Sequence, residues 1–233
     1  MTGRFAHFSP LHNLILVLTL IVTAMLVVYA RRSGSEKNPR YLGYAIGAIL
    51  LANYAAYVVY RIHSGHWAPR YDLPMELCNW AAFATSLALF TRNRFVGELA
   101  YFWVMAGSVN GVISPDLTVT FPHPYFFIFF IAHSGLVCGV LYLVFGLKAY
   151  PRPRAVLRVW LFSQVYLATA FLTNYALGGN YGYTMAKPAA GSLLDYLGPW
   201  PWYLLSLEGL ALLLYSLLYL PFFLLRQRVK ESP

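Results

Sequence analysis

Long apolar runs recur along the chain, which restricts it to folds that a lipid bilayer can accept. They cover residues 11–30, 41–62, 75–90, 96–114, 124–146, 155–177 and 201–225. Most approach the about 20 residues that a helix needs to cross the hydrocarbon core. With 59% hydrophobic and only 11% charged residues, an ordinary soluble domain is excluded. We therefore predict an all-α integral membrane protein, a single domain over residues 1–233 with seven transmembrane helices.

Basic residues are divided unequally between the two sets of loops. Thirteen of the 17 Lys and Arg residues follow odd-numbered runs. Because cytoplasmic loops are enriched in Lys and Arg, this pattern predicts an N-terminus outside and a C-terminus in the cytoplasm. Arg31 and Arg32 directly follow the first run, which indicates a retained helix and not a cleaved signal peptide. We expect a multi-pass protein of the cell membrane.

Several functional classes are disfavoured by the same residues. The net charge of +9 comes from short basic clusters between apolar runs, which suit lipid headgroups better than nucleic acid. All four lysines lie in predicted loops or the tail, so a retinal Schiff base is excluded. His63, His66 and Asp72 are better explained by an interfacial position than by a metal site. No metal or other cofactor is expected.

Cys78 lies near the start of the third run, within the sequence Tyr-Asp-Leu-Pro-Met-Glu-Leu-Cys-Asn-Trp. Asp72 is typical of an N-cap and Pro74 of a first turn, so a helix is predicted to begin here with Cys78 one to two turns inside. The positive end of a helix favours a thiolate, whereas burial in hydrocarbon favours the neutral thiol. A reactive Cys78 therefore needs a nearby base. Cys138 is expected to be a small buried hydrophobe, and no disulfide is indicated.

Most polar residues within the runs fall in the outer half of the predicted membrane. They are His12, Glu76, Cys78, Asn79, Asn110, His133, Asn174 and Glu208. Because polar groups are costly in lipid, these side chains should face one another in a chamber open to the outer leaflet. Cys78 and His133 lie at similar depth on different runs, as a thiolate–imidazole pair requires. Hydrogen bonds between helices would explain the His and Asn residues without chemistry.

Several motifs resemble the YwaF family of bacterial integral membrane proteins over nearly the whole chain. The matching segments are Phe8-Ser-Pro-Leu-His12, Leu73-Pro-Met-Glu-Leu-Cys78, Asn110-Gly111, His133, Asn180-Tyr181 and Leu197-Gly-Pro-Trp-Pro-Trp-Tyr203. That family is similar in turn to transmembrane protein 164, a multi-pass acyltransferase that adds polyunsaturated acyl chains to ether phospholipids. The resemblance implies a nucleophilic Cys78 and a basic His133. Asn79 replaces a histidine and the proline lies farther from the cysteine, so only the reaction type carries over.

The expected function is a lipid acyltransferase that forms an acyl-thioester on Cys78 with His133 as base. Phospholipids or lysophospholipids would be its substrates. Asn79 and Asn110 are candidates to bind the oxyanion, and Glu76 or Glu208 to orient the imidazole or bind a headgroup. The candidates for substrate binding are His12, Asn174, Tyr181, Trp200 and Trp202.

Two other classes remain open from the sequence. A lipid or small-molecule binding or transport protein would use the same chamber without breaking bonds. A purely structural scaffold would explain the helices but not the one-sided cluster of polar residues.

Overall fold

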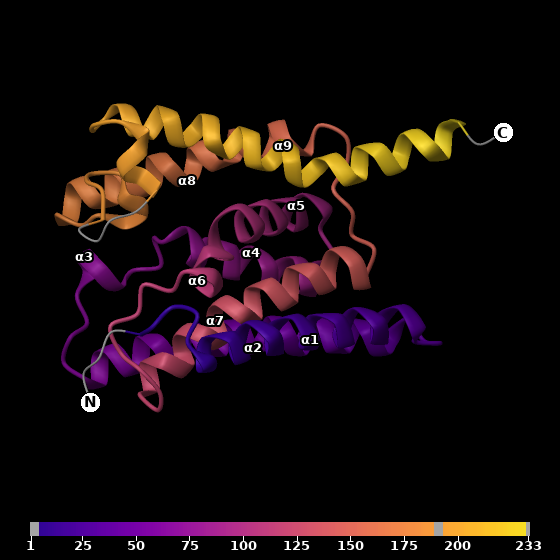
Figure 1. Cartoon of the computed structure of the whole chain (residues 1–233), viewed down its shortest axis with the longest axis horizontal. Coiled ribbons are helices and arrows are strands. Elements are labelled where there is room, and N and C mark those ends of the chain that lie inside the picture. The colour runs from indigo at the N-terminus through magenta and orange to yellow at the C-terminus, as the bar shows by residue number, and fades with distance from the viewer. Residues whose placement is uncertain (1–4, 189–192, 232–233) are drawn as a thin grey trace.

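The computed structural model describes residues 5–188 and 193–231, and the regular structure of these residues is helical throughout (Figure 1). Six helical segments are long and apolar enough to cross a membrane, which makes the chain a multi-pass membrane protein. They are α1 (Pro10–Arg32), α2 (Lys37–His63), the segment Arg94–Ile113, the segment Pro124–Gly146, α8 (Ala155–Leu177) and α9 (Trp202–Glu231). The remaining predicted span, the third in chain order, corresponds to the shorter helix α4 (Leu77–Thr91).

Helix α4 is the central element of the bundle. It packs against α2 on one side and α5 (Arg94–Trp103) on the other. Ala81 and Ala88 are completely buried, because small side chains let the neighbouring helices approach closely. With 15 residues, the helix rises about 22 Å, less than the hydrocarbon thickness of a bilayer.

The predicted start of this helix is wrong. Asp72 is the last residue of the short helix α3 (Pro69–Asp72), Pro74 lies in the non-helical segment that follows, and α4 begins at Leu77. The reason is that the Asp72 carboxylate is already occupied: Tyr57, Arg61 and the backbone N–H of Ala68 all donate to it. Asp72 therefore stabilises α3 and does not cap α4.

Two of the spans contain a π-helical turn. In the fourth span, η1 (Val104–Ser108) separates α5 from α6 (Asn110–Ile113). In the fifth, η2 (Tyr142–Gly146) follows α7 (Pro124–Leu141). A π turn shifts the helical register and often occurs at functional sites. Ser108 is the last residue of η1.

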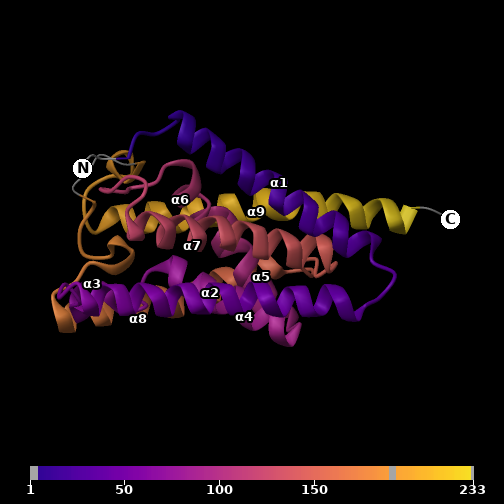
Figure 2. The same ribbon diagram turned by 90° about the horizontal axis from the view of Figure 1, so that it is seen from below.

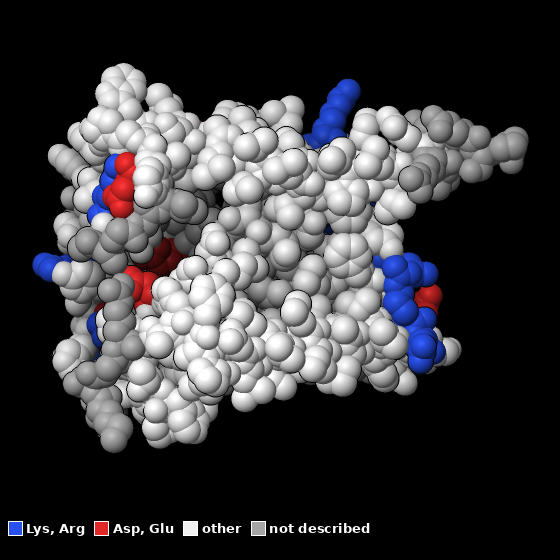
Figure 3. Space-filling view, viewed as in Figure 1, with Lys and Arg blue, Asp and Glu red and all other residues white. Residues whose placement is uncertain are grey.

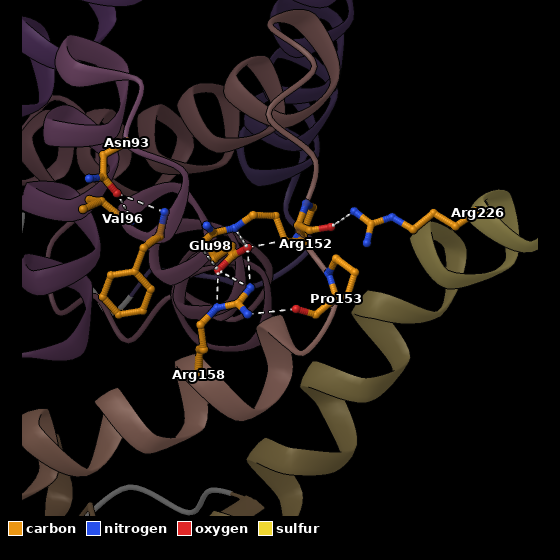
Figure 4. Close-up of polar contacts among 9 residues, drawn as sticks. Asn93, Val96, Glu98, Arg152, Pro153, Arg158 and Arg226 are labelled. Carbon is orange, nitrogen blue, oxygen red and sulfur yellow. Dashed lines mark hydrogen bonds and ion pairs between the residues drawn. The ribbon is translucent and has the colours of Figure 1, made fainter. Parts of the chain in front are cut away.

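The helices form layers, with α8 and α9 together on one side of α4 and α5, and α1, α2 and α7 on the other (Figures 1 and 2). One ion-pair cluster joins α5 to α8 (Figure 4). Glu98 of α5 is only 2% exposed and accepts hydrogen bonds from both Arg152 and Arg158. Arg226 of α9 donates to the carbonyl of Pro151 in the same loop. These contacts satisfy a carboxylate that would otherwise be costly to bury.

Helix α1 begins and helix α9 ends at opposite ends of the bundle (Figure 1). Figure 3 shows basic atoms clustered around an acidic one at the end of the bundle where α9 finishes. The exposed basic residues Arg31 and Arg32 lie in the last turn of α1, and Lys37 begins α2. This distribution agrees with the charge asymmetry in the sequence, while the direction of insertion stays a prediction. Arg4 and residues 189–192 of the loop 178–200 lie outside the described residues.

Candidate functional site

Cys78 is the second residue of α4, in its first turn and not deeper in the helix as predicted. Glu76 occupies the N-cap position, but its side chain makes no capping hydrogen bond. Its carbonyl accepts from the N–H groups of Asn79 and Trp80. Among the described residues, no backbone carbonyl accepts from the N–H groups of Leu77 and Cys78; the Leu77 N–H faces the Tyr166 hydroxyl, and the Cys78 N–H faces its own sulfur. The half-buried thiol therefore lies at a helix end whose first N–H groups have no backbone acceptor and which carries a positive partial charge.

Two buried hydroxyl groups without partners flank this helix end. Ser108 of η1 is 1% exposed and lies beside the thiol of Cys78. Tyr166 of α8 is 8% exposed, and its hydroxyl lies near the backbone N–H of Leu77. Neither hydroxyl makes a hydrogen bond of normal geometry. Among the described residues only Trp160 has another such buried side-chain atom, so two of the three occur next to Cys78.

A loop that begins after α8 lies over the Tyr166 hydroxyl. Gly182 of η3 (Tyr181–Tyr183) has φ +59°, and a Cβ at this position would be 2.5 Å from the hydroxyl oxygen of Tyr166. The N–H of Gly182 donates to a carboxylate oxygen of Glu76 at 3.1 Å. Only glycine combines this conformation with so close an approach. The predicted candidate Glu76 thus connects the start of α4 to the loop above it.

His133 is fixed in α7 by two contacts. Its Nδ1 lies 2.9 Å from the carbonyl oxygen of Phe129, and its ring stacks on that of Phe129 with centroids 4.2 Å apart. Because a carbonyl can only accept, Nδ1 carries the hydrogen, and in the neutral ring Nε2 carries the lone pair. Nε2 has no hydrogen-bond partner among the described residues. His133 therefore has the tautomer that a general base requires.

Gly111 creates the space that the imidazole fills. A Cβ at Gly111 would lie 2.1 Å from Cδ2 and 2.6 Å from Nε2 of His133. Gly111 is three residues after Ser108, about one helical turn further along the same segment. The thiol of Cys78 and the imidazole of His133 thus contact neighbouring turns of the fourth span. Within the described part of the chain, no hydrogen bond joins the two side chains.

Three of the predicted substrate-binding residues use their polar atoms within the fold. His12 is completely buried; its Nδ1 accepts from Phe8 and its Nε2 donates to Val112, both at 2.8 Å. Asn174 donates to Tyr181 and Thr184 and accepts from the N–H of Tyr181. The Tyr181 hydroxyl donates to Pro69 and accepts from Leu73. These residues position the loops around α4.

The other predicted candidates are more accessible. Asn79 is half-buried and Asn110 is exposed. Glu208 accepts from Gln164 at 2.6 Å. Trp200 and Trp202 are 53% and 63% exposed, as expected for aromatic residues at a membrane interface. At this end of the molecule, Figure 3 shows acidic atoms set back in a hollow of the surface.

Asp72 holds the approach to α4 outside the membrane spans. Burial alone would raise the pKa of Asp72, but the hydrogen bonds from Arg61, Tyr57 and the N–H of Ala68 outweigh it. The result is a pKa below the ordinary value of 3.8, so the carboxylate is ionised at neutral pH. The ionised carboxylate thus holds α3, the short helix that precedes Cys78 in the chain, against α2.

Ser108 and Tyr166 were not among the residues singled out from the sequence. Serine in an apolar helix commonly bonds to the carbonyl of its own preceding turn, and tyrosine is abundant at membrane interfaces. The sequence carries no signal that would separate these two residues from such cases. Only the packing around them reveals that their hydroxyls lack partners.

A model of the TMEM164 family matches residues 7–219. The match contains Cys78, Ser108, Gly111, His133 and Tyr166, and it ends within α9. No curated protein and no solved structure shows significant similarity to the chain. The resemblance to the YwaF family stays a prediction.

Proposed function

The chain belongs to the TMEM164 family, and from this premise we propose that it is a membrane-embedded lipid acyltransferase. Cys78 is the nucleophile and His133 the general base. The observation that carries the proposal is that the Cys78 thiol lies beside Ser108, while the His133 imidazole lies against Gly111, three residues further along the fourth span. The family membership supports a lipid-related function in the membrane, and the thiol and imidazole supply the chemistry.

The first half-reaction transfers an acyl chain to the enzyme. Nε2 of His133 takes the proton of the Cys78 thiol, and the thiolate attacks the ester carbonyl of a donor phospholipid. The carbon–sulfur bond forms while the carbonyl electron pair moves to oxygen. When the carbonyl reforms, the ester carbon–oxygen bond breaks, and the leaving lysolipid oxygen takes the proton from the imidazolium. The products are an acyl-thioester and a lysophospholipid.

The second half-reaction returns the acyl chain to lipid. The hydroxyl group of an acceptor lysophospholipid gives its proton to Nε2 and attacks the thioester carbonyl. The carbon–sulfur bond breaks, and the sulfur recovers the proton from the imidazolium. The reacting groups of donor and acceptor lipids lie near the hydrocarbon boundary. If the site faces outward as predicted, α4 begins at that depth in the outer leaflet. Substrate binding must bring the thiol and imidazole within hydrogen-bond distance, as catalytic contacts often tighten only with substrate.

A binding or transport protein is the second candidate. The observation that favours it is that the thiol and the imidazole make no hydrogen bond to each other among the described residues. On this alternative, lipid occupies the space near α4 without covalent chemistry. Replacement of Cys78 would then leave binding intact.

Intact-protein mass spectrometry of the detergent-purified protein, incubated with phosphatidylcholine micelles, tests the proposal. We expect the mass of the wild-type protein to increase by one acyl chain that hydroxylamine removes. Cys78 variants should show no such increase. Cys138→Ala is the matched control, because the Cys138 thiol is buried and accepts a hydrogen bond from Thr23. This variant should still form the adduct. His133→Ala should slow adduct formation about 10²- to 10⁴-fold. If the wild-type protein stays unmodified, and it and Cys78→Ala bind phospholipid equally well, the result would favour a binding protein instead.

A further inference from the structure

The two unpartnered hydroxyls next to Cys78 require an explanation. Buried polar side chains almost always have a hydrogen-bond partner, because the water they lose on folding must be replaced. Ser108 and Tyr166 are at least nine-tenths buried, yet neither has one. Both are donors, and they come from different helical elements, η1 and α8. A shared site for an acceptor atom would account for both.

The start of α4 supplies further donors to the same place. The helix has 15 residues and its N-cap side chain makes no capping bond, so the positive end of its dipole is left for another acceptor. The N–H of Leu77 lies near the Tyr166 hydroxyl, and the thiol of the next residue lies beside Ser108. Backbone and side-chain donors therefore converge around the sulfur atom.

We propose that the Cys78 N–H and the hydroxyls of Ser108 and Tyr166 form an oxyanion-binding site for the carbonyl oxygen of an acyl ester or thioester. The site rests on the proposed function, because it acts on the reaction of Cys78. When sulfur attacks, the carbonyl electron pair moves to oxygen and these three donors stabilise the charge. When the leaving-group bond breaks, the pair returns and the donors are released. The carbonyl oxygen is the missing acceptor.

The surroundings suit this role. The loop at Gly182 lies directly over the Tyr166 hydroxyl, which keeps water away from the donor. Hydrogen bonds to a developing charge are strongest where water is excluded. Asn110, a candidate from the sequence, is exposed and less suited to such a site.

Two reagents with different transition states test the site on purified protein. p-Nitrophenyl octanoate acylates a thiol through a tetrahedral oxyanion, whereas iodoacetamide alkylates it without one. Tyr166→Phe should slow octanoylation of Cys78 about 10²- to 10³-fold and leave its alkylation unchanged. Ser108→Ala should slow octanoylation more than alkylation, because its hydroxyl also lies beside the sulfur. Adduct formation is followed by intact mass.

The matched control is Tyr101→Phe. The Tyr101 hydroxyl donates to the carbonyl of Leu218, so this variant should have a lower unfolding temperature but normal octanoylation. Tyr166→Phe removes a hydroxyl without a partner, so its unfolding temperature should be retained. Normal octanoylation of both Tyr166→Phe and Ser108→Ala would overturn the oxyanion site while leaving the acyltransferase intact. If the wild-type protein forms no octanoyl adduct at Cys78, the proposed function fails and the site fails with it.

Discussion

At the scale of single residues, a glycine determines where the base of the proposed reaction lies. A methyl group at Gly111 would overlap the His133 ring, at 2.1 Å from Cδ2. Gly111→Ala should therefore displace the imidazole and slow acyl-thioester formation about 10²-fold, the cost of misplacing a catalytic group by about 1 Å. Intact mass after incubation with phosphatidylcholine measures the rate.

Gly209→Ala provides the matched control for that substitution. Gly209 lies within α9, and a Cβ there would meet no atom within 4 Å. Alanine should leave acylation unchanged and stabilise the helix by up to about 1 kcal/mol. A normal rate in Gly111→Ala would show that the observed position of the imidazole is irrelevant to the reaction.

The sequence predicted some residues of the site but not others, and the reason is physical. Cys78 and His133 stand out because a thiol near a predicted helix start and an imidazole at similar predicted depth can form a nucleophile–base pair. Ser108 and Tyr166 do not stand out, because most such hydroxyls find a partner in the fold. For His12 and Asn174 the reverse is true: the sequence suggested that they bind substrate, but hydrogen bonds within the fold occupy their polar atoms.

At the scale of elements, the Asp72 carboxylate holds the short helix α3, and with it the segment that leads into α4. Asp72 is 2% exposed and its pKa is lowered below 3.8 by Arg61, Tyr57 and the Ala68 N–H, although burial opposes the shift. A lowered folded-state pKa means that the contribution is present above about pH 4 and is lost as the pH falls through the folded-state value. The hydrogen bonds between Asp72 and α2 should therefore weaken only when the pH falls below about 4.

The substitution Asp72→Asn tests this link. At pH 7 it should lower the free energy of unfolding by about 3 kcal/mol, because Arg61 loses a buried partner but is itself partly exposed. Unfolding in mixed micelles, measured from pH 7 to pH 3, should show this difference shrinking below pH 4. Glu36→Gln is the control, since the Glu36 side chain makes no capping bond. A difference that stays constant down to pH 3 would contradict the assignment to the ionised carboxylate.

Among the described residues, six of the seven predicted spans coincide with helices long and apolar enough to cross a membrane, whereas the third coincides with the shorter helix α4. Apolar length alone marks the spans, and the observed helices begin and end within a few residues of the predicted ones. The start of α4 was misplaced because Asp72 and Pro74 are typical of a helix N-terminus, yet tertiary contacts bind the carboxylate elsewhere. The π turn at η1 has no local sequence signal, although it ends at Ser108, which lies beside the Cys78 thiol.

At the scale of the whole molecule, the two ends of the bundle differ chemically. One end carries the exposed Arg31, Arg32 and Lys37 and the arginines that surround Glu98 (Figures 3 and 4). The other holds the start of α4 and the loop with Gly182. Such an asymmetry favours a cytoplasmic basic end, which would open the proposed site to the outer leaflet. The donor lipid would then come from the outer leaflet.

Lysine labelling tests that orientation directly. Lys187 follows η3 at the end where α4 begins, whereas Lys37 starts α2 and Lys148 follows η2 at the basic end. A membrane-impermeant amine reagent applied to intact cells should therefore modify Lys187 and spare Lys37 and Lys148 until detergent is added. Peptide mass spectrometry gives the modified positions, and the permeabilised sample is the control for reactivity. Labelling of Lys37 and Lys148 in intact cells, with Lys187 protected, would invert the orientation and move the proposed site to the cytoplasmic leaflet. The chain would then be inserted against the direction that its basic residues favour.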